Sequence, residues 1–311
     1  MADYLKSTRR GTPKDSATPL ELFGYRIVDR LGVGAGSTIY AAQDPQTLQV
    51  VALKHVVRTN EKSIRFVEQL EAEYEVSRGI QHPNLRRALV YKVSKTLLRK
   101  VTDAALIMEM VDGKPLETHL PRSIPEIVDV FVQTARGLHH LHGRGYVHCD
   151  LKPNNILRCS DRHVKVIDLG QTCRAGTVKP RIQGTPDYIA PEQVRCEPVT
   201  FKTDIYNFGA TLYWCLCGKN FPTLFTLKKG ENSFLVDSQI PTPMELNPRV
   251  PEPLSNLVME CVRTNASRRP ADMVELGRRL ETVQLSLISP VSRAVDPAAS
   301  GLRSAVSPLS S

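Results

Sequence analysis

The chain of 311 residues contains no apolar run that approaches the ~18 residues with which a helix crosses a membrane. Its first ten residues, MADYLKSTRR, lack the apolar stretch of a secretory signal. Its seven cysteines show neither the spacing of a zinc site nor a CxxC pair. We therefore expect a cytoplasmic protein without a membrane span, and we interpret Cys215 and Cys217 as small buried hydrophobes.

Aromatic residues are scarce, at 6% of the chain, and this bears on the excess of positive charge. Lysine and arginine number 41 against 32 acidic residues, which gives a net charge of +9. The basic stretch 86–100, which begins with Arg86, contains no acidic residue, whereas residues 61–75 are rich in glutamate. A basic stretch without a platform of aromatic side chains is usually a solvated face. We therefore expect no nucleic-acid partner.

The hydrophobic pattern changes along the chain. Between residues 25 and 57, short β-branched runs broken by glycine predict antiparallel strands. Residues 64–80 then repeat apolar side chains at helical spacing, with Ile64 and Tyr74 on one predicted inner face. Two further strand-like runs follow, and after Gly113 the pattern becomes helical.

This order of elements predicts an α+β fold with two lobes. The small lobe, at about residues 21–110, is expected to be an antiparallel sheet with one main helix. The large lobe, at about residues 112–285, is expected to be mainly helical. Residues 1–20 are basic and polar, and residues 286–311 are rich in Ser, Ala and Pro, so we expect two disordered tails.

Two features of the small lobe are typical of phosphate binding. The loop Gly32-Val33-Gly34-Ala35-Gly36-Ser37 lies between two predicted strands, and glycines let backbone N–H groups approach phosphate oxygens. Lys54 follows on a strand whose apolar neighbours face the same side, and Glu73 on the predicted helix is the carboxylate we expect to pair with it. The structural alternative is a Gly-rich hairpin followed by an exposed strand lysine.

Two loops of the large lobe carry further polar groups. Asp150, Lys152 and Asn155 lie in YVHCDLKPNNIL, and Asp168 follows in VIDLG. Two carboxylates and an amide, each flanked by apolar residues, suit a hydroxyl nucleophile together with Mg2+, an ion that takes oxygen ligands. Two further motifs follow along the chain, TPDYIAPE at residues 185–192 and TDIY at residues 203–206.

These motifs, in this order, resemble the catalytic domain of Ser/Thr protein kinases over roughly Tyr25 to Leu285. The loop GAGSTIY is similar to that of soluble eukaryotic-like kinases of bacteria. The resemblance implies ATP and Mg2+ as cofactors and Ser or Thr hydroxyls of proteins as acceptors, and it implies nothing about the oligomeric state. The alternative is a pseudokinase, a scaffold that binds nucleotide or partner proteins without transfer.

The resemblance also implies a role for each position. Asp150 orients the acceptor hydroxyl and accepts its proton, while Lys152 lies near the transferred phosphate. Lys54 contacts the α and β phosphates, and Asn155 and Asp168 hold Mg2+. The positions implied in ATP binding, which include the gatekeeper and the hinge, are Leu31, Gly32, Gly34, Gly36, Ser37, Ile39, Ala52, Lys54, Met108, Glu109, Val111 and Leu157.

Four positions depart from the family pattern. Ser37 replaces the third glycine of the loop and Leu169 replaces the usual phenylalanine, and neither change threatens transfer. Ser77 stands where the family has a large apolar residue, so we expect the helix that carries Glu73 to be held less firmly. Cys149 stands where many relatives have an arginine, so we expect activity without phosphorylation of Thr172 or Thr177 in the activation segment, residues 168–192.

Other conspicuous residues have structural interpretations. The histidines between residues 139 and 148 are expected on a helix surface and in the core rather than in a metal site. Asp204 is expected to hold the backbone of the catalytic loop, and Glu192 is expected to pair with Arg269. We therefore assign none of these residues to acid or base catalysis.

Overall fold

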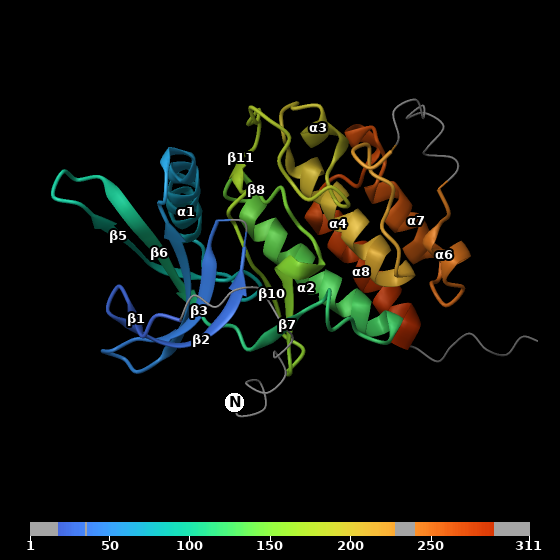
Figure 1. The fold of residues 1–311 in the computed structure, drawn as a ribbon. Helices are drawn as coiled ribbons and strands as arrows, with labels where there is room; N and C mark the ends of the chain where they lie inside the picture. The colour runs from blue at the N-terminus through green and yellow to red at the C-terminus, as the bar shows by residue number, and fades with distance from the viewer. Residues whose placement is uncertain (1–17, 35, 228–239, 289–311) are drawn as a thin grey trace, which may run out of the picture.

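The computed structural model describes residues 18–34, 36–227 and 240–288, which form two lobes (Figure 1). A sheet with one main helix makes the small lobe, and helices dominate the large lobe, so the predicted two-lobed α+β fold is confirmed. The tails expected at 1–20 and 286–311 lie largely outside the described residues. Among the described residues, no helix combines the length and apolar character needed to cross a membrane.

The small lobe is a six-stranded antiparallel sheet in the order β1-β2-β3-β4-β6-β5, with helix α1 (Ile64–Ser77) against one face (Figure 1). Its strands are β1 (Glu21–Leu22), β2 (Tyr25–Val33), β3 (Thr38–Gln43), β4 (Val50–Val57), β5 (Ala88–Lys95) and β6 (Val101–Glu109).

Side chains of β4 alternate between two apolar clusters on opposite faces of the sheet. Val51 and Leu53 belong to the cluster away from α1, whereas Ala52 and Val56 pack with apolar residues of α1. Because successive strand residues point to opposite faces, Lys54 shares the α1 side with Ala52 and Val56. The sheet therefore directs this lysine toward the helix.

Helix α1 buries a face that starts later than the sequence pattern predicted. Ile64, expected on the inner face, is 38% exposed, and the buried face consists of Val67, Leu70, Glu73 and Ser77. The prediction for Ile64 is wrong because the first helical turn precedes the part of the helix that packs on the sheet.

The large lobe is built around α2 and α4, whose Phe131 and Phe208 rings meet edge to face at a centroid distance of 5.0 Å. Its helices are α2 (Ile124–His142), α3 (Pro191–Val194), α4 (Phe201–Cys217), α6 (Pro243–Leu246), α7 (Glu252–Cys261) and α8 (Met273–Ile288). Its strands are β7 (Gly113–Pro115), β8 (Tyr146–Val147), β9 (Ile156–Cys159), β10 (Val164–Val166) and β11 (Cys173–Arg174).

Helix α8 packs along α2 and corrects one predicted boundary. It continues to Ile288, past the expected start of the C-terminal tail at residue 286, because Leu287 still packs against the core. Cys215 on α4 is 3% exposed and belongs to the same core, as its interpretation as a small buried hydrophobe predicted, whereas Cys217 is only half-buried and packs against that core.

Candidate active site

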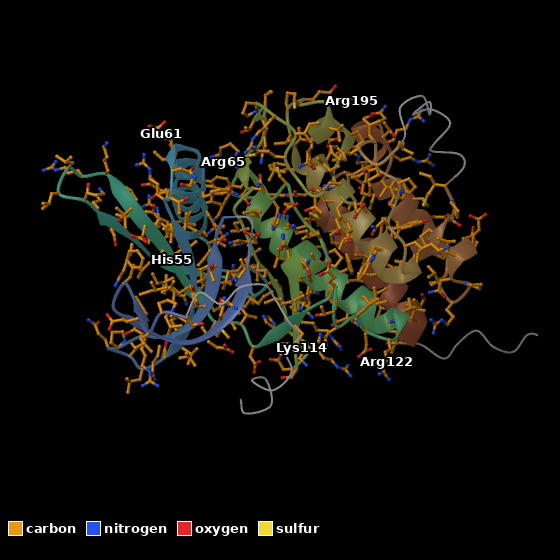
Figure 2. The ribbon with its side chains drawn as sticks, in the orientation of Figure 1. His55, Glu61, Arg65, Lys114, Arg122 and Arg195 are labelled. Atoms are coloured by element: carbon orange, nitrogen blue, oxygen red, sulfur yellow. The ribbon has the colours of Figure 1, made fainter. Side chains whose placement is uncertain are left out.

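A cavity of about 1140 Å³ lies between the two lobes. The β2–β3 hairpin and α1 border it on one side, and residues of 150–155 and 167–183 border it on the other. Arg65, labelled in Figure 2, is one of the α1 residues on the cavity side. We call this cavity the cleft.

The β2–β3 hairpin carries the Gly-rich loop, and Gly32, Gly34, Gly36 and Ser37 all border the cleft. The Gly34 N–H donates to the Ser37 carbonyl at 2.7 Å and so closes the loop. A Cβ atom on Gly36 would lie 2.6 Å from the ring of Phe66 on α1. Glycine at this position therefore allows the loop backbone to rest directly on the Phe66 ring.

Lys54 joins three elements through its ammonium group. Its Nζ lies 2.7 Å from Glu73 Oε2 on α1 and 3.0 Å from Asp168 Oδ1 in the large lobe. Glu73 is 3% exposed, whereas the neighbouring Glu71 and Glu75 are exposed, so helical spacing selected the right carboxylate. The pair also positions α1 against the sheet.

Lys54 and Asp168 stabilise each other's charged forms. Burial alone would lower the pKa of Lys54, but the carboxylates of Glu73 and Asp168 outweigh it and hold that pKa above its ordinary value. Burial alone would raise the pKa of Asp168, but Lys54 and then Arg86 hold that pKa below its ordinary value. Lys54 and Asp168 therefore stay charged at neutral pH.

Arg86 and Gln69 are among the residues that border the cleft although the sequence did not single them out as site residues. Arg86 was expected on a solvated face, and this prediction is wrong. Its backbone N–H donates to the Val166 carbonyl at 3.0 Å, and the residue borders the cleft. Gln69 donates from Nε2 to the Gly170 carbonyl at 3.0 Å. Its only sequence signal is helical spacing, one turn before Glu73.

Asp150 and Lys152, which lie in residues 148–155 (the catalytic loop), form a closed triangle of hydrogen bonds with Thr185 of the activation segment. Thr185 Oγ1 donates to Asp150 Oδ1 at 2.7 Å. Lys152 Nζ donates to Asp150 Oδ2 at 3.0 Å and to Thr185 Oγ1 at 2.9 Å. Asp150 and Lys152 both border the cleft. The triangle fixes both carboxylate oxygens of Asp150 while leaving the residue accessible from the cleft.

The backbone of this loop is held by Asp204, which is fully buried on α4. Its carboxylate accepts hydrogen bonds from the N–H groups of His148 and Cys149, each at 2.8 Å, and lies 2.8 Å from His142 Nε2. These bonds stabilise Cys149 in a left-handed conformation, with φ of +66°. The geometry agrees with the expected structural role of Asp204.

Asn155 and Asp168 lie side by side because the Ile167 N–H donates to the Asn155 carbonyl at 2.9 Å. The Asn155 amide nitrogen donates to the Asp150 carbonyl at 2.9 Å, which leaves its amide oxygen for a ligand. An amide oxygen beside a carboxylate is a donor set that fits Mg2+. Among the described residues, no group of three or more His, Cys, Asp or Glu side chains could hold a metal ion.

The positions expected around adenine are only partly brought together. Ile39 borders the cleft, and Ala52 and Met108 are opposed across β4 and β6. Met108 borders a separate cavity of about 10 Å³. Six of the positions expected to bind ATP do not border the cleft as the described residues form it: Leu31, Ala52, Met108, Glu109, Val111 and Leu157. Their contact with adenine stays a prediction.

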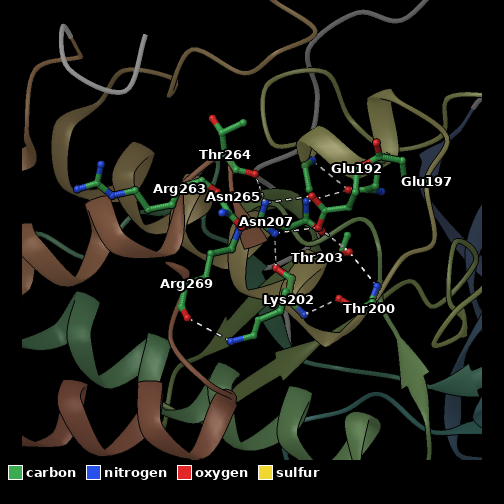
Figure 3. Close-up of polar contacts among 12 residues, drawn as sticks. Glu192, Glu197, Thr200, Lys202, Thr203, Asn207, Arg263, Thr264, Asn265 and Arg269 are labelled. Atoms are coloured by element: carbon green, nitrogen blue, oxygen red, sulfur yellow. Dashed lines mark hydrogen bonds and ion pairs between the residues drawn. The ribbon is translucent and has the colours of Figure 1, made fainter. Parts of the chain in front are cut away.

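Glu192 and Arg269 form a buried two-point ion pair in the large lobe (Figure 3). The two N–O distances are 2.8 and 3.0 Å, and Thr203 Oγ1 donates to the same carboxylate at 2.8 Å. Lys202 Nζ donates to the Arg269 carbonyl at 3.1 Å. The pair attaches α3 to the chain before α8, as expected from the sequence.

Comparison with known proteins decides the family. Residues 25–277 match the family profile described as a protein kinase domain. The chain belongs to the protein kinase family. A probable serine/threonine-protein kinase of Clostridium acetobutylicum is 28% identical over 290 residues, which are 88% of this chain and 42% of the relative.

Two other relatives of this kinase domain come from distant organisms. The probable serine/threonine-protein kinase PknB of Lactococcus lactis is 27% identical over 267 residues, or 81% of this chain and 40% of the relative. The human serine/threonine-protein kinase ULK3 is 31% identical over 260 residues, or 81% of this chain and 53% of the relative. The chain thus spans about half or less of the length of these relatives.

Proposed function

We propose that this kinase domain transfers the γ-phosphoryl group of ATP to Ser or Thr hydroxyls of protein substrates, with Mg2+ as cofactor. The observation that carries the proposal is the triangle of Asp150, Lys152 and Thr185, which borders the same cleft as the ion-paired Lys54 and Asp168. The free thiols of all seven cysteines support the cytoplasm as its compartment.

Asp150 is the group that handles the acceptor hydroxyl. Lys152 and Thr185 fix its carboxylate, so that the acceptor's Oγ–H can donate to it from the cleft. The acceptor oxygen forms a bond to the γ phosphorus, the bond to the β-phosphate oxygen breaks, and ADP leaves. The hydroxyl proton passes to Asp150.

The remaining residues position charge. Phosphoryl transfer needs little covalent help, so alignment and neutralisation of the phosphate charge supply most of the acceleration. Lys54 and the backbone N–H groups of the Gly-rich loop bind the phosphates. Asn155 and Asp168 would hold Mg2+, which would neutralise phosphate charge when bound.

The acceptor class follows from Lys152 and Thr185. Their 2.9 Å hydrogen bond closes one side of the space around Asp150, so a short side-chain hydroxyl reaches the carboxylate. A phenol would project too far. The relatives' names, which specify serine/threonine kinases, support the same class.

The test is incubation with γ-labelled ATP, Mg2+ and generic protein substrates, followed by phosphosite mapping. We expect label on Ser and Thr from the wild type and from Asp161→Asn, a control at an exposed aspartate, but not from Asp150→Asn. Label mainly on Tyr would overturn the acceptor class. Nucleotide binding without any transfer by the wild type would favour the pseudokinase scaffold instead.

A further inference from the structure

Two cysteines from separate segments meet beside the catalytic loop. Cys149 lies in that loop, and Cys173 begins β11, which pairs with β8. Their sulfur atoms are 3.8 Å apart, and both are free thiols. Val147, Val199 and Phe201 pack around the pair. A thiol pair of this kind is within reach of a disulfide after a small movement.

Cys149 is the fixed member of the pair. It is 1% exposed, and its backbone N–H donates to Asp204 Oδ1 at 2.8 Å. Its carbonyl accepts from Gln193 Nε2 at 2.8 Å, and its Sγ lies 3.6 Å from the Val147 carbonyl oxygen. Hydrogen bonds to the N–H and to the carbonyl of Cys149 therefore fix its backbone and with it the position of its sulfur.

Cys173 is the reactive member. It is partly exposed and borders the cleft with Lys179, so a small reagent reaches it from that side. The hydrogen bond from Cys149 lowers the pKa of Cys173 to about 7 against the effect of burial, and the charge of Lys179 helps. The same contact and burial raise the pKa of Cys149 well above its usual value, so Cys149 stays a thiol.

We propose that Cys149 and Cys173 are an oxidation site for hydroperoxides, at which the two thiols form a disulfide that links the catalytic loop to the activation segment. The catalytic aspartate chemistry proposed above plays no part in this step. In a reducing compartment such a bond is transient and sensitive to the supply of oxidant.

The reaction balances with hydrogen peroxide as the only co-reactant. The Cys173 thiolate attacks one peroxide oxygen, the O–O bond breaks, hydroxide leaves, and a sulfenic acid forms. The Cys149 sulfur then attacks the Cys173 sulfur, the S–O bond breaks, and water leaves with the thiol proton. Overall, two thiols lose two electrons to the peroxide, and both of its oxygen atoms end as water.

The bond requires movement of the activation segment. The sulfur atoms must approach by roughly 1.8 Å to reach a disulfide length of about 2.05 Å. Because Cys149 is held by Asp204 and Gln193, Cys173 makes most of this movement. Strand β11 has only two residues and one strand partner, so it yields more easily than the catalytic loop.

The experiment is mild peroxide treatment of the whole protein, followed by alkylation, trypsin digestion and mass spectrometry. The expected product joins the peptide 145–158 to the peptide 166–174, and dithiothreitol separates them. A product that accumulates as sulfinic acid on Cys173, or a disulfide that uses another cysteine in preference, would overturn the proposal.

Three variants sharpen the assignment. Cys173→Ser is expected to lose the linked peptide, and Cys149→Ser is expected to leave a Cys173 sulfenic acid that dimedone captures. Cys196→Ser, a control at another partly exposed cysteine, is expected to retain the link. Lys54→Met is expected to form the link as the wild type does, so a failure of the proposed transferase function leaves this result intact. If Cys149→Ser does not fold, the wild-type peptide map decides the question alone.

Discussion

Lys165 on β10 and Glu109 at the end of β6 form an ion pair between the two lobes, with Nζ and Oε1 2.8 Å apart. Lys165 Nζ also lies 3.4 Å from the Leu85 carbonyl oxygen, and the lysine is 9% exposed. The pair therefore connects the large lobe to the strand that leads into it.

We expect Lys165→Met to lower the free energy of unfolding by about 1 kcal/mol, because Glu109 remains partly solvated when its partner is removed. Lys114→Met on β7, which belongs to the same three-stranded sheet as β10, is the matched control, since Lys114 is exposed (labelled in Figure 2). Urea unfolding followed by Trp214 fluorescence measures both. Equal effects of the two variants would contradict a specific role for the pair.

Removal of the Lys54 charge is expected to abolish most of the transfer. Lys54→Met should reduce turnover by roughly a hundredfold to a thousandfold, because one such electrostatic contact is worth about 2.7–4 kcal/mol in the transition state. Asp168→Asn should have a similar effect. Lys95→Met, at an exposed strand lysine, is the control, and circular dichroism checks folding. Wild-type turnover in both site variants would contradict the kinase assignment.

Activity is expected without phosphorylation of the activation segment. Cys149 supplies a neutral thiol where many relatives have a guanidinium, so no unpaired positive charge awaits a phosphate there. Thr172 Oγ1 is buried and has no hydrogen-bond partner among the described residues. The measurement compares the double variant Thr172→Ala/Thr177→Ala with phosphatase-treated wild type. A loss of about a hundredfold in both, or ~2.7 kcal/mol, would show that phosphorylation is required.

Ser77 tests how tightly α1 is packed behind the ion pair. Its hydroxyl donates to the Glu73 carbonyl at 2.5 Å, and the adjoining cavity has a volume of only about 10 Å³. Ser77→Leu is therefore expected to overpack the site and to cost about 1–3 kcal/mol of stability, with a fall in turnover. Glu71→Leu on the exposed side of α1 is the control. A Ser77→Leu variant that gains stability and activity would show that the helix was underpacked.

The Glu192–Arg269 pair predicts a pH dependence of stability. Burial alone would raise the pKa of Glu192, but hydrogen bonds from Arg269 outweigh it and lower that pKa from 4.5. Because the folded-state pKa is the lower one, this stabilisation is complete above pH 4.5 and is lost as the pH falls through the folded-state value.

Glu192→Gln is expected to lose about 3 kcal/mol at pH 7, because it leaves a buried arginine without its counter-charge. Its stability should then depend less on acid than that of the wild type. Glu197→Gln, at an exposed residue in the same region (Figure 3), is the control. Identical acid dependence of the wild type and Glu192→Gln in urea unfolding would contradict this account.

Local patterns in the sequence were sufficient for several parts of the site. Alternation along β4 predicted the side on which Lys54 lies, and helical spacing selected Glu73 over its neighbours. Both depend on regular geometry within one element. The resemblance to protein kinases then implied that Asp150 and Asp168 act at one site, and both residues border the cleft.

Other features depend on contacts that no local pattern contains. The sequence predicted Arg86 in a solvated basic stretch, but a backbone hydrogen bond to Val166 places it at the border of the cleft. The sulfur atoms of Cys149 and Cys173 approach because β8 and β11 pair, and neither strand has more than two residues to signal it. Strands of two residues are too short to show the alternation of apolar and polar side chains by which a strand is recognised in a sequence.

The contact between Gly36 and Phe66 has a thermodynamic consequence for the small lobe. Because Gly36 carries no side chain, the loop backbone packs directly on the Phe66 ring, so an outward shift of α1 removes the surface on which the loop rests. The coupling between ligand binding and helix position is reciprocal. If displacement of α1 lowers the affinity for a ligand under the loop by some factor, the bound ligand lowers the equilibrium constant for displacement of α1 by the same factor. A ligand bound under the loop is thereby an effector of the helix that carries Glu73, and the contact between Gly36 and Phe66 transmits the coupling.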